Sequence, residues 1–203
     1  MNASDDPRLR LAPPGDRAGP WLFALSFGLP MALGVAAVTT PLLRGGQPLR
    51  LIEGSVPLTV GLVLGGLALS CGALWWVLAR FMRRQGLAIT GAELDVRSSF
   101  YRCRMPLAEL KLEQARVVDL DEHTELRPTL KTNGFSIPGF RSGWFLLRNR
   151  RRTFVAIGDG RRKLWLPGSG RRDLLIEPVD PAAMLARLRE LAADGLATPP
   201  RAG

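Results

Sequence analysis

Two long apolar stretches near the start of the chain constrain its fold more than any other feature of the sequence. They cover residues 21–43 and 56–78, and neither contains Asp, Glu, Lys or Arg. The hydrocarbon core of a bilayer is about 30 Å thick, and about 20 apolar residues in a helix cross it. The sequence therefore predicts a transmembrane hairpin, with helices over residues 21–43 and 56–80 joined by an external loop at residues 44–55.

Two other interpretations of these stretches fit their length less well. A cleaved signal peptide has an apolar region of about 7–15 residues, and a second full-length span would not follow it at once. Two helices buried in a soluble core would not need uncharged stretches this long. The rest of the chain is long enough for one soluble domain, which we place at residues 86–194. We expect residues 1–20, which are rich in Pro, Gly and charge, and residues 195–203 to be disordered tails.

Basic residues beside the two stretches predict which side of the membrane each end of the chain occupies. The connecting loop contains only Arg44 and Arg50. The outer flanks contain more basic residues, namely Arg8, Arg10, Arg17, Arg80, Arg83, Arg84 and Arg97. Because basic residues next to a span favour the cytoplasmic side, we expect a multi-pass protein of the inner cell membrane with both termini in the cytoplasm. With no charged side chain inside either stretch, the hairpin is predicted to be an anchor and not a transporter.

Small residues recur within both predicted spans. Ala24, Gly28, Ala32 and Ala36 share one face of the first helix, and Gly61 and Gly65 form a GxxxG sequence in the second. Small residues let helix backbones approach closely in lipid. Two interpretations remain open: the two helices pack against each other, or they associate with another copy.

The soluble part has the pattern of a mostly β domain closed by one helix. Short alternating stretches are separated by turn residues, and Asp159-Gly160 is typical of a tight hairpin turn. Asp180-Pro181 predicts a helix start, and Met184, Leu185 and Leu188 follow at helical spacing. The pattern predicts about seven strands, the later ones in a regular meander, followed by a C-terminal helix.

Two segments carry a resemblance to a known family. Residues 132–145 (TNGFSIPGFRSGWF) and residues 177–181 (EPVDP) resemble bacterial PH-like (pleckstrin-homology-like) domain families, which occur in membrane proteins with one or two N-terminal spans. The resemblance covers roughly residues 87–191. It implies a PH-like barrel closed by the C-terminal helix. Most such families have no assigned ligand or reaction, so the resemblance implies no activity.

Basic residues supply the candidate binding sites, in a chain whose formal net charge is +10. Successive turns of a meander alternate between its two ends, which predicts that residues 150–152 share an end with residues 171–172 and lie opposite residues 161–163. The candidates for an anionic surface are Arg150, Arg151, Arg152, Arg171 and Arg172. Basic residues near an anionic leaflet gain about 1 kcal/mol each, so these arginines either orient the domain on lipid or form an ordinary solvated surface. The glycine-rich segment before residue 145 is either a packed connection or a ligand loop with Lys131, Asn133 and Arg141 as contacts.

Catalytic chemistry is harder to find. The only histidine, His123, lies in the acidic segment at residues 119–125, and Cys103 is the only cysteine outside the apolar stretches. A metal site would need further ligands, and a Cys103–His123 pair would need an orienting group, and no motif identifies either. The chain has no phosphate-binding loop, no dinucleotide fingerprint and no GxSxG sequence. We therefore expect no catalytic residue, no metal and no cofactor.

Three classes of function are compatible with these features. The first, which we favour, is a non-enzymatic membrane-tethered binding or scaffolding module that engages a protein partner or anionic lipid headgroups. The second is an enzyme with an unrecognised site on the basic β domain. The third is a nucleic-acid-binding module, for which the arginines are suitable but no recognition motif is present.

Overall fold

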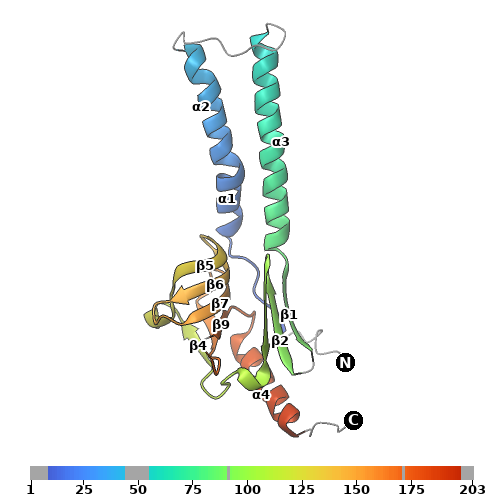
Figure 1. Ribbon diagram of the computed structural model, residues 1–203, viewed down its shortest axis with the longest axis vertical. Coiled ribbons are helices and arrows are strands. Elements are labelled where there is room, and N and C mark those ends of the chain that lie inside the picture. The colour runs from blue at the N-terminus through green and yellow to red at the C-terminus, as the bar shows by residue number, and fades with distance from the viewer. Residues whose placement is uncertain (1–8, 44–54, 91, 171, 198–203) are drawn as a thin grey trace. The chain divides into compact units, whose positions relative to one another are not determined.

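The computed structural model describes residues 9–43, 55–90, 92–170 and 172–197 (Figure 1). The chain divides into two compact units. One is formed by residues 19–81, and the other by residues 1–18 together with residues 82–203. The predicted loop at residues 44–55 falls outside the described residues except for Ser55.

The first unit contains two apolar helical segments. The first runs through α1 (Ala18–Phe23), a π-helical turn η3 (Ala24–Gly28) and α2 (Leu29–Leu43), and the second is α3 (Val56–Met82). Both are long and apolar enough to span a membrane, over Ala18–Pro41 and Val56–Met82. The wide π turn ends two residues before Pro30, which lacks the N–H that would otherwise bond the carbonyl of Ser26. Many apolar side chains point outward, and Leu69 in the middle of α3 is 77% exposed. A helix that is apolar all round fits a lipid environment.

The two helical segments pack against each other. The ring of Phe23 meets the ring of Trp75 edge-on, with centroids 5.7 Å apart. A Cβ on Gly34 would lie only 2.3 Å from a methyl carbon of Leu67, so this glycine permits a close approach. Gly61 and Gly65 have open space where a Cβ would be. The GxxxG sequence is therefore not used in the contact between these two helices.

The second unit begins with a small antiparallel sheet. It contains β1 (Gln85–Thr90), β2 (Glu93–Ser98) and β3 (Tyr101–Pro106), in the order β1-β2-β3. The hairpin and third strand predicted from the sequence are confirmed. Alternation places the apolar side chains on one buried face, formed by Leu87, Ile89, Leu94, Val96, Cys103 and Met105.

A larger sheet follows, with six strands. These are β4 (Arg116–Asp119), β5 (Pro128–Ile137), β6 (Phe140–Leu147), β7 (Arg152–Ile157), β8 (Arg162–Leu166) and β9 (Arg172–Ile176). Their order is β4-β8-β9-β7-β6-β5. The glycine-rich segment at residues 132–145 is not a long connection. It is the paired β5–β6 hairpin, which turns at Gly139 with a φ of 85°.

The predicted meander is wrong in one respect. β7 pairs with β9 in parallel, and β8 lies on the far side of β9, so Asp159-Gly160 does not close a hairpin between neighbouring strands. The turn between β7 and β8 is bonded to the residue that follows β9. The carboxylate of Glu177 accepts the N–H groups of Gly158 at 2.7 Å and Gly160 at 2.9 Å. Buried Lys163 forms an ion pair with the same carboxylate.

Two apolar clusters lie on opposite faces of the larger sheet. The larger cluster is covered by the small sheet and by α4 (Pro181–Ala197), which buries Met184 and Leu188. The smaller cluster contains Phe145, Val155 and Leu175 and is covered by Leu126. The described strands number nine, in two sheets that do not close into a barrel, instead of the expected barrel of about seven strands. The difference arises because β4 and β5, which lack clear alternation in the sequence, are both paired.

Both ends of the second unit are more ordered than expected. The helix α4 is capped by Asp180, whose carboxylate accepts the N–H groups of Ala182 and Ala183 at 3.0 Å each, and it continues to Ala197. Residues 9–17 were expected to be disordered, but Leu9 is buried in the larger cluster. The backbone of Ala12 donates to Glu177 at 2.7 Å. Residues 1–8 and 198–203 lie outside the described part of the chain.

Candidate functional site

The strand register brings part of the predicted arginine group together. Arg152 at the start of β7 is paired with Arg172 at the start of β9. Arg162 lies at the opposite end, because β8 runs antiparallel to β9. The larger sheet therefore has one end with Arg152 and Arg172 and another with Arg161, Arg162 and Lys163. The neighbouring Arg150 is exposed in a turn with a φ of 63°, and Arg171 lies outside the described residues.

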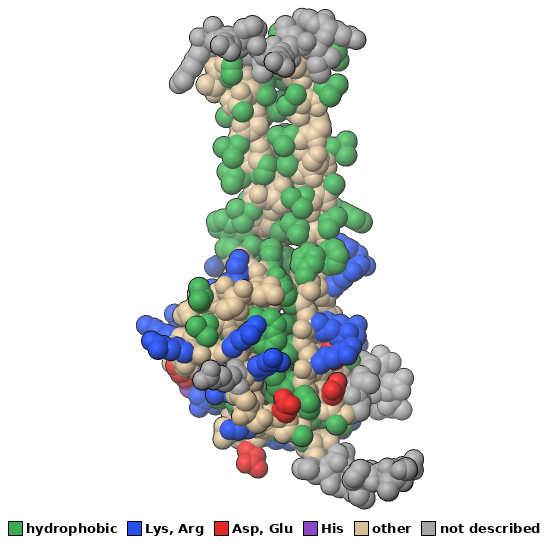
Figure 2. Space-filling view, viewed as in Figure 1, with side chains coloured by type: hydrophobic (Ala, Val, Ile, Leu, Met, Phe, Trp, Pro, Cys, Tyr) green, Lys and Arg blue, Asp and Glu red, His purple; other side chains and the backbone are tan. Residues whose placement is uncertain are grey.

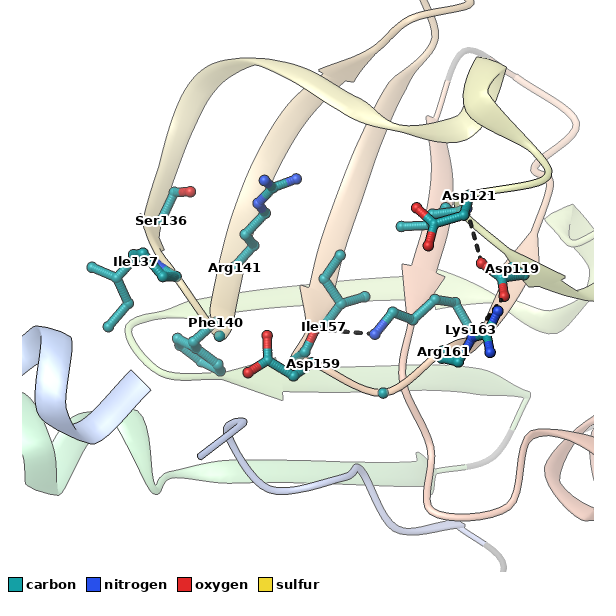
Figure 3. Close-up of a pocket in the computed structure, with 15 residues that line it drawn as sticks. Asp119, Asp121, Ser136, Ile137, Phe140, Arg141, Ile157, Asp159, Arg161 and Lys163 are labelled. Atoms are coloured by element: carbon teal, nitrogen blue, oxygen red, sulfur yellow. Dashed lines mark hydrogen bonds and ion pairs between the residues drawn. The ribbon is translucent and has the colours of Figure 1, made fainter. Parts of the chain in front are cut away.

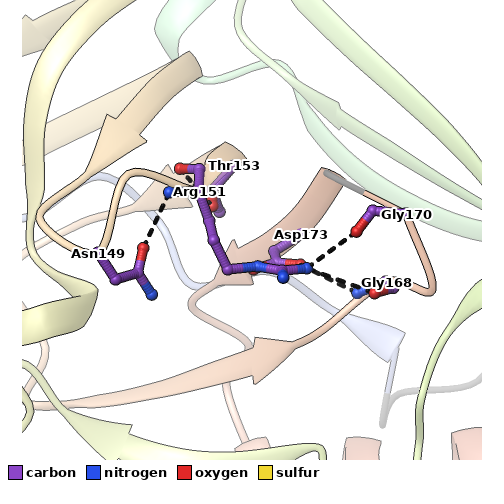
Figure 4. Close-up of polar contacts among 6 residues, drawn as sticks. All are labelled: Asn149, Arg151, Thr153, Gly168, Gly170 and Asp173. Atoms are coloured by element: carbon purple, nitrogen blue, oxygen red, sulfur yellow. Dashed lines mark hydrogen bonds and ion pairs between the residues drawn. The ribbon is translucent and has the colours of Figure 1, made fainter.

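Arg151 is neutralised inside the fold. Its guanidinium donates to the two carboxylate oxygens of Asp173 at 2.5 and 2.6 Å (Figure 4). It also donates to the carbonyl of Gly170 at 3.0 Å, and Asp173 accepts the N–H of Gly168 at 3.0 Å. The hydrogen bond with Asp173, which is fully buried, raises the pKa of Arg151. Arg151 therefore anchors the turn before β9 and is not available to a ligand.

Arg152 and Arg172 are held over one aromatic ring. Their guanidinium carbons lie 5.1 and 6.0 Å from the ring centroid of Trp144 on β6. Trp144 is half-buried and meets Phe154 edge-on, with centroids 5.4 Å apart. Across the described chain, neither arginine forms an ion pair. Stacking on a ring restricts each guanidinium while leaving its N–H edges available.

The edge strand β5 extends this surface. Leu130 pairs with Leu146, and Leu146 pairs with Arg152, so one row across the sheet contains an exposed leucine and both stacked arginines. Leu130 is 58% exposed. Asn133 pairs with Trp144 in the next row. We call Leu130, Asn133, Trp144, Arg152 and Arg172 the Trp144 patch.

Arg172 of the patch lies near the small sheet. Arg172 is close enough to Cys103 on β3 to lower the pKa of that thiol, but burial is the larger effect and raises the pKa to about 11. The thiol therefore stays protonated near neutral pH and lacks the thiolate that an activated nucleophile requires. Figure 2 shows Lys and Arg side chains gathered over the surface of the β unit, interspersed with a few acidic ones.

Lys131 and Arg141 belong to the opposite face of the larger sheet. Lys131 is paired with Phe145, and Arg141 with Ile157, and both partners belong to the smaller apolar cluster. The predicted set Lys131, Asn133 and Arg141 is therefore divided between two faces. Asn133 alone joins the arginines that stack on Trp144.

Arg141 lines a cavity of about 550 Å³ (Figure 3). The apolar part of the lining includes Ile137, Phe140 and Ile157. The charged part is mixed, because Asp119 contacts Arg161 at 3.4 Å, and Asp121 accepts a hydrogen bond from Arg127 at 2.5 Å. Lys163, which also lines the cavity, is paired with Glu177. With acids and bases in similar number, the cavity has no net preference for an anion.

The acidic segment around His123 forms local contacts. His123 Nδ1 lies 3.4 Å from a carboxylate oxygen of Glu125, and the N–H of Asp121 donates to Asp119 at 2.8 Å. Within the described ranges, no group of three or more His, Cys, Asp or Glu side chains is placed to hold a metal ion.

Two features of the β unit were not predicted from the sequence. Trp144 was not singled out, because the sequence does not show that Arg152 and Arg172 lie over its ring. Asp95 was missed as well. Its carboxylate accepts Arg102 Nε at 2.7 Å and Arg97 Nη2 at 3.1 Å on the outer side of the small sheet.

Comparison with known proteins identifies no relative: no family model, no curated protein and no solved structure matches the chain. The protein consists of two apolar helical segments followed by a domain rich in β-sheet.

Proposed function

We propose that this protein is a non-enzymatic binding or scaffolding module, tethered to the membrane by α1–α2 and α3, that binds an acidic segment of a protein partner. The observation that carries the proposal is the Trp144 patch, where Arg152 and Arg172 stack on one ring and have no acidic partner among the described residues. Two cations left unpaired side by side repel each other, and an acidic ligand relieves that repulsion.

The geometry of the patch favours a carboxylate-bearing ligand. A guanidinium presents paired N–H groups that match a carboxylate, and one whose plane is already fixed by stacking loses less entropy when it binds. Exposed Leu130 adds an apolar contact in the same row as the arginines. Arginine and aromatic residues beside an apolar contact are typical of protein interfaces.

We also propose a location and a family. The basic residues that flank the helices, including Arg17, Arg83 and Arg84, support a cytoplasmic β domain on the inner membrane. Successive strands followed by a C-terminal helix that buries Met184 and Leu188 against the sheet support a divergent PH-like domain.

Charge reversal tests the binding proposal in the full-length protein. The variant Arg152→Glu/Arg172→Glu changes the patch, and Arg161→Glu/Arg162→Glu makes the same change of charge at the opposite end of the sheet. Each protein would be purified in mild detergent from its host, and the partner retained would be quantified. We expect the patch variant to retain at least about tenfold less partner than the control, because like charges across an interface cost several kcal/mol.

Equal retention by the two variants would contradict the proposal. A lipid ligand would give a different pattern. The patch variant would then lose salt-sensitive protection of the β unit in nanodiscs containing phosphatidylglycerol, with no change in nanodiscs of phosphatidylcholine and no change in protein retention.

A further inference from the structure

The turn between β2 and β3 carries an exposed aromatic side chain and is hydrogen-bonded to the residues that follow α3 in the chain. Phe100, in this turn, is 50% exposed. The preceding residue, Ser99, has a left-handed φ of 55°, and its N–H donates to the carbonyl of Arg84 at 2.9 Å. Since α3 ends at Met82, this hydrogen bond holds the turn to a residue only two positions beyond the helix.

We propose that Phe100 inserts into the interfacial layer of the membrane and thereby fixes the orientation of the β domain on the lipid surface. This inference rests on the proposed membrane anchoring by α3. It adds a second attachment, made by the folded domain itself.

The length of α3 determines how deep in the membrane the β2–β3 turn lies. Its 27 residues extend for about 40 Å at about 1.5 Å per residue. That exceeds the hydrocarbon core of about 30 Å, so the last turn of the helix, with Arg80, reaches the headgroups. Two further residues add at most about 7 Å. Arg84 and the turn bonded to it therefore lie at the depth where Phe side chains partition into the boundary between headgroups and acyl chains.

The residues before the first helix are held at the same part of the β domain. The N–H of Gly15 donates to the carbonyl of Gly139 at 3.0 Å, three residues before α1 begins at Ala18. Gly139 immediately precedes β6, and Ser142 within β6 donates its hydroxyl to the carbonyl of Ser98 at 2.7 Å. In a hairpin anchor both helices meet the same membrane surface. The domain edge that holds their flanking residues, with the β2–β3 turn, is therefore the edge that faces lipid.

Spin-label accessibility tests this inference on the full-length protein in nanodiscs of phosphatidylethanolamine and phosphatidylglycerol. Single labels would be placed at Phe100→Cys, Leu130→Cys and Leu69→Cys in a background carrying Cys71→Ala and Cys103→Ala. Leu130 is a matched control, because it is an apolar residue of similar exposure on the edge strand β5. Leu69 reports the interior of α3.

We expect the label at position 100 to collide more often with oxygen than with a water-soluble nickel complex, and the label at position 130 to show the reverse. A water-like label at position 100 beside a lipid-like label at position 69 would overturn the inference and leave the anchoring intact. A water-like label at position 69 would overturn both.

A second measurement retains both native cysteines. Trypsin cleavage after Arg83 and Arg84 would be compared in Phe100→Asp and Leu130→Asp, in the same nanodiscs. If Phe100 holds the domain to the lipid, its replacement by Asp speeds cleavage at least about fivefold, the effect of roughly 1 kcal/mol. Equal cleavage rates in the two variants would overturn the inference.

Discussion

At the residue scale, charged side chains of the β unit serve two different purposes. Arg151 and Lys163 are paired with the buried carboxylates of Asp173 and Glu177, and both pairs hold turns of the larger sheet. Arg152, the next residue in the chain and the first of β7, stacks instead on Trp144. Neighbouring arginines with the same chemistry therefore take different roles, because their side chains reach different partners.

Removing the buried carboxylate of Asp173 should destabilise the β unit. Asp173→Ala removes the carboxylate that accepts from the Arg151 guanidinium and from the Gly168 N–H, and we expect a loss of about 2–3 kcal/mol in the free energy of unfolding. Chemical unfolding followed by tryptophan fluorescence would measure this loss. Arg152→Ala is the control, with an expected effect within about 0.5 kcal/mol because Arg152 is exposed. Equal effects of the two substitutions would contradict a structural role for the Arg151–Asp173 pair.

Asp95 should make the stability of the small sheet depend on pH. The hydrogen bond from Arg102 is the main cause that lowers the pKa of Asp95 below its ordinary value of 3.8; burial opposes it, and Arg97 adds to it. A carboxyl whose pKa is lower in the folded state contributes stability above its unfolded pKa, and that contribution is lost as the pH falls through the folded pKa.

The measurement compares the free energy of unfolding of the native protein and of Asp95→Asn between neutral pH and pH values below 3.8. We expect the native protein to have the larger free energy of unfolding at neutral pH, and we expect its advantage over Asp95→Asn to shrink as the pH falls. Asp121→Asn, at a largely exposed carboxylate, should show little difference throughout. If the difference in the free energy of unfolding between the native protein and Asp95→Asn stays constant with pH, the ionised carboxylate is not the source of that difference.

At the scale of elements, the β5–β6 hairpin positions Trp144 in the patch. It depends on Gly143, whose φ is 112° and where a Cβ would lie 2.6 Å from the carbonyl oxygen of Asn133. The glycine lets β5 approach β6 closely, beside the pairing of Asn133 with Trp144. The position of Trp144 in the patch therefore depends on a glycine at position 143.

Replacement of Gly143 by Ala should weaken this hairpin. The left-handed backbone and the overlap with β5 together should cost at least about 2 kcal/mol in the free energy of unfolding. Gly86→Ala in β1 is a suitable control, because a Cβ there would meet open space. Thermal unfolding of the two variants would measure the difference. A Gly143→Ala protein as stable as Gly86→Ala would show that β5 can shift without cost.

At the scale of the whole molecule, two units of different character share one chain. One consists of apolar helices with outward-facing leucines, and the other of two sheets with buried apolar clusters. Outward-facing apolar surface of this extent is costly in water, because burial of apolar area is the main stabilising term in folding.

The anchoring proposal predicts how the protein fractionates. The full-length chain should stay in membranes washed with alkaline carbonate and should leave them only in detergent, because withdrawal of either span exposes about 20 apolar residues to water. Immunoblotting of the washed pellet and supernatant would measure this. A peripheral protein held only by basic residues is released by the same wash, and that result would contradict the anchoring.

Local sequence patterns were sufficient for features that depend on neighbours along the chain. The two apolar helices, the β1–β2 hairpin, the Asp180 cap and the order of strands before a final helix all follow from local composition, alternation and turn chemistry. Pairing between strands that are distant in the sequence does not follow from such local patterns. The parallel contact of β7 with β9 brings Glu177 to the turn at Gly158 and Gly160, two contacts between residues far apart in the sequence.

The candidate site shows the same division. The sequence by itself predicted that residues 150–152 would share one end of a sheet with residues 171–172, and the pairing of Arg152 with Arg172 confirms this for those two residues. Tertiary structure alone decided that Asp173 neutralises Arg151, that Arg152 and Arg172 stack on Trp144, and that residues 9–17 lie against the domain. The physical reason is that alternation specifies the face of a strand, whereas the partner of a charge depends on which strands become neighbours.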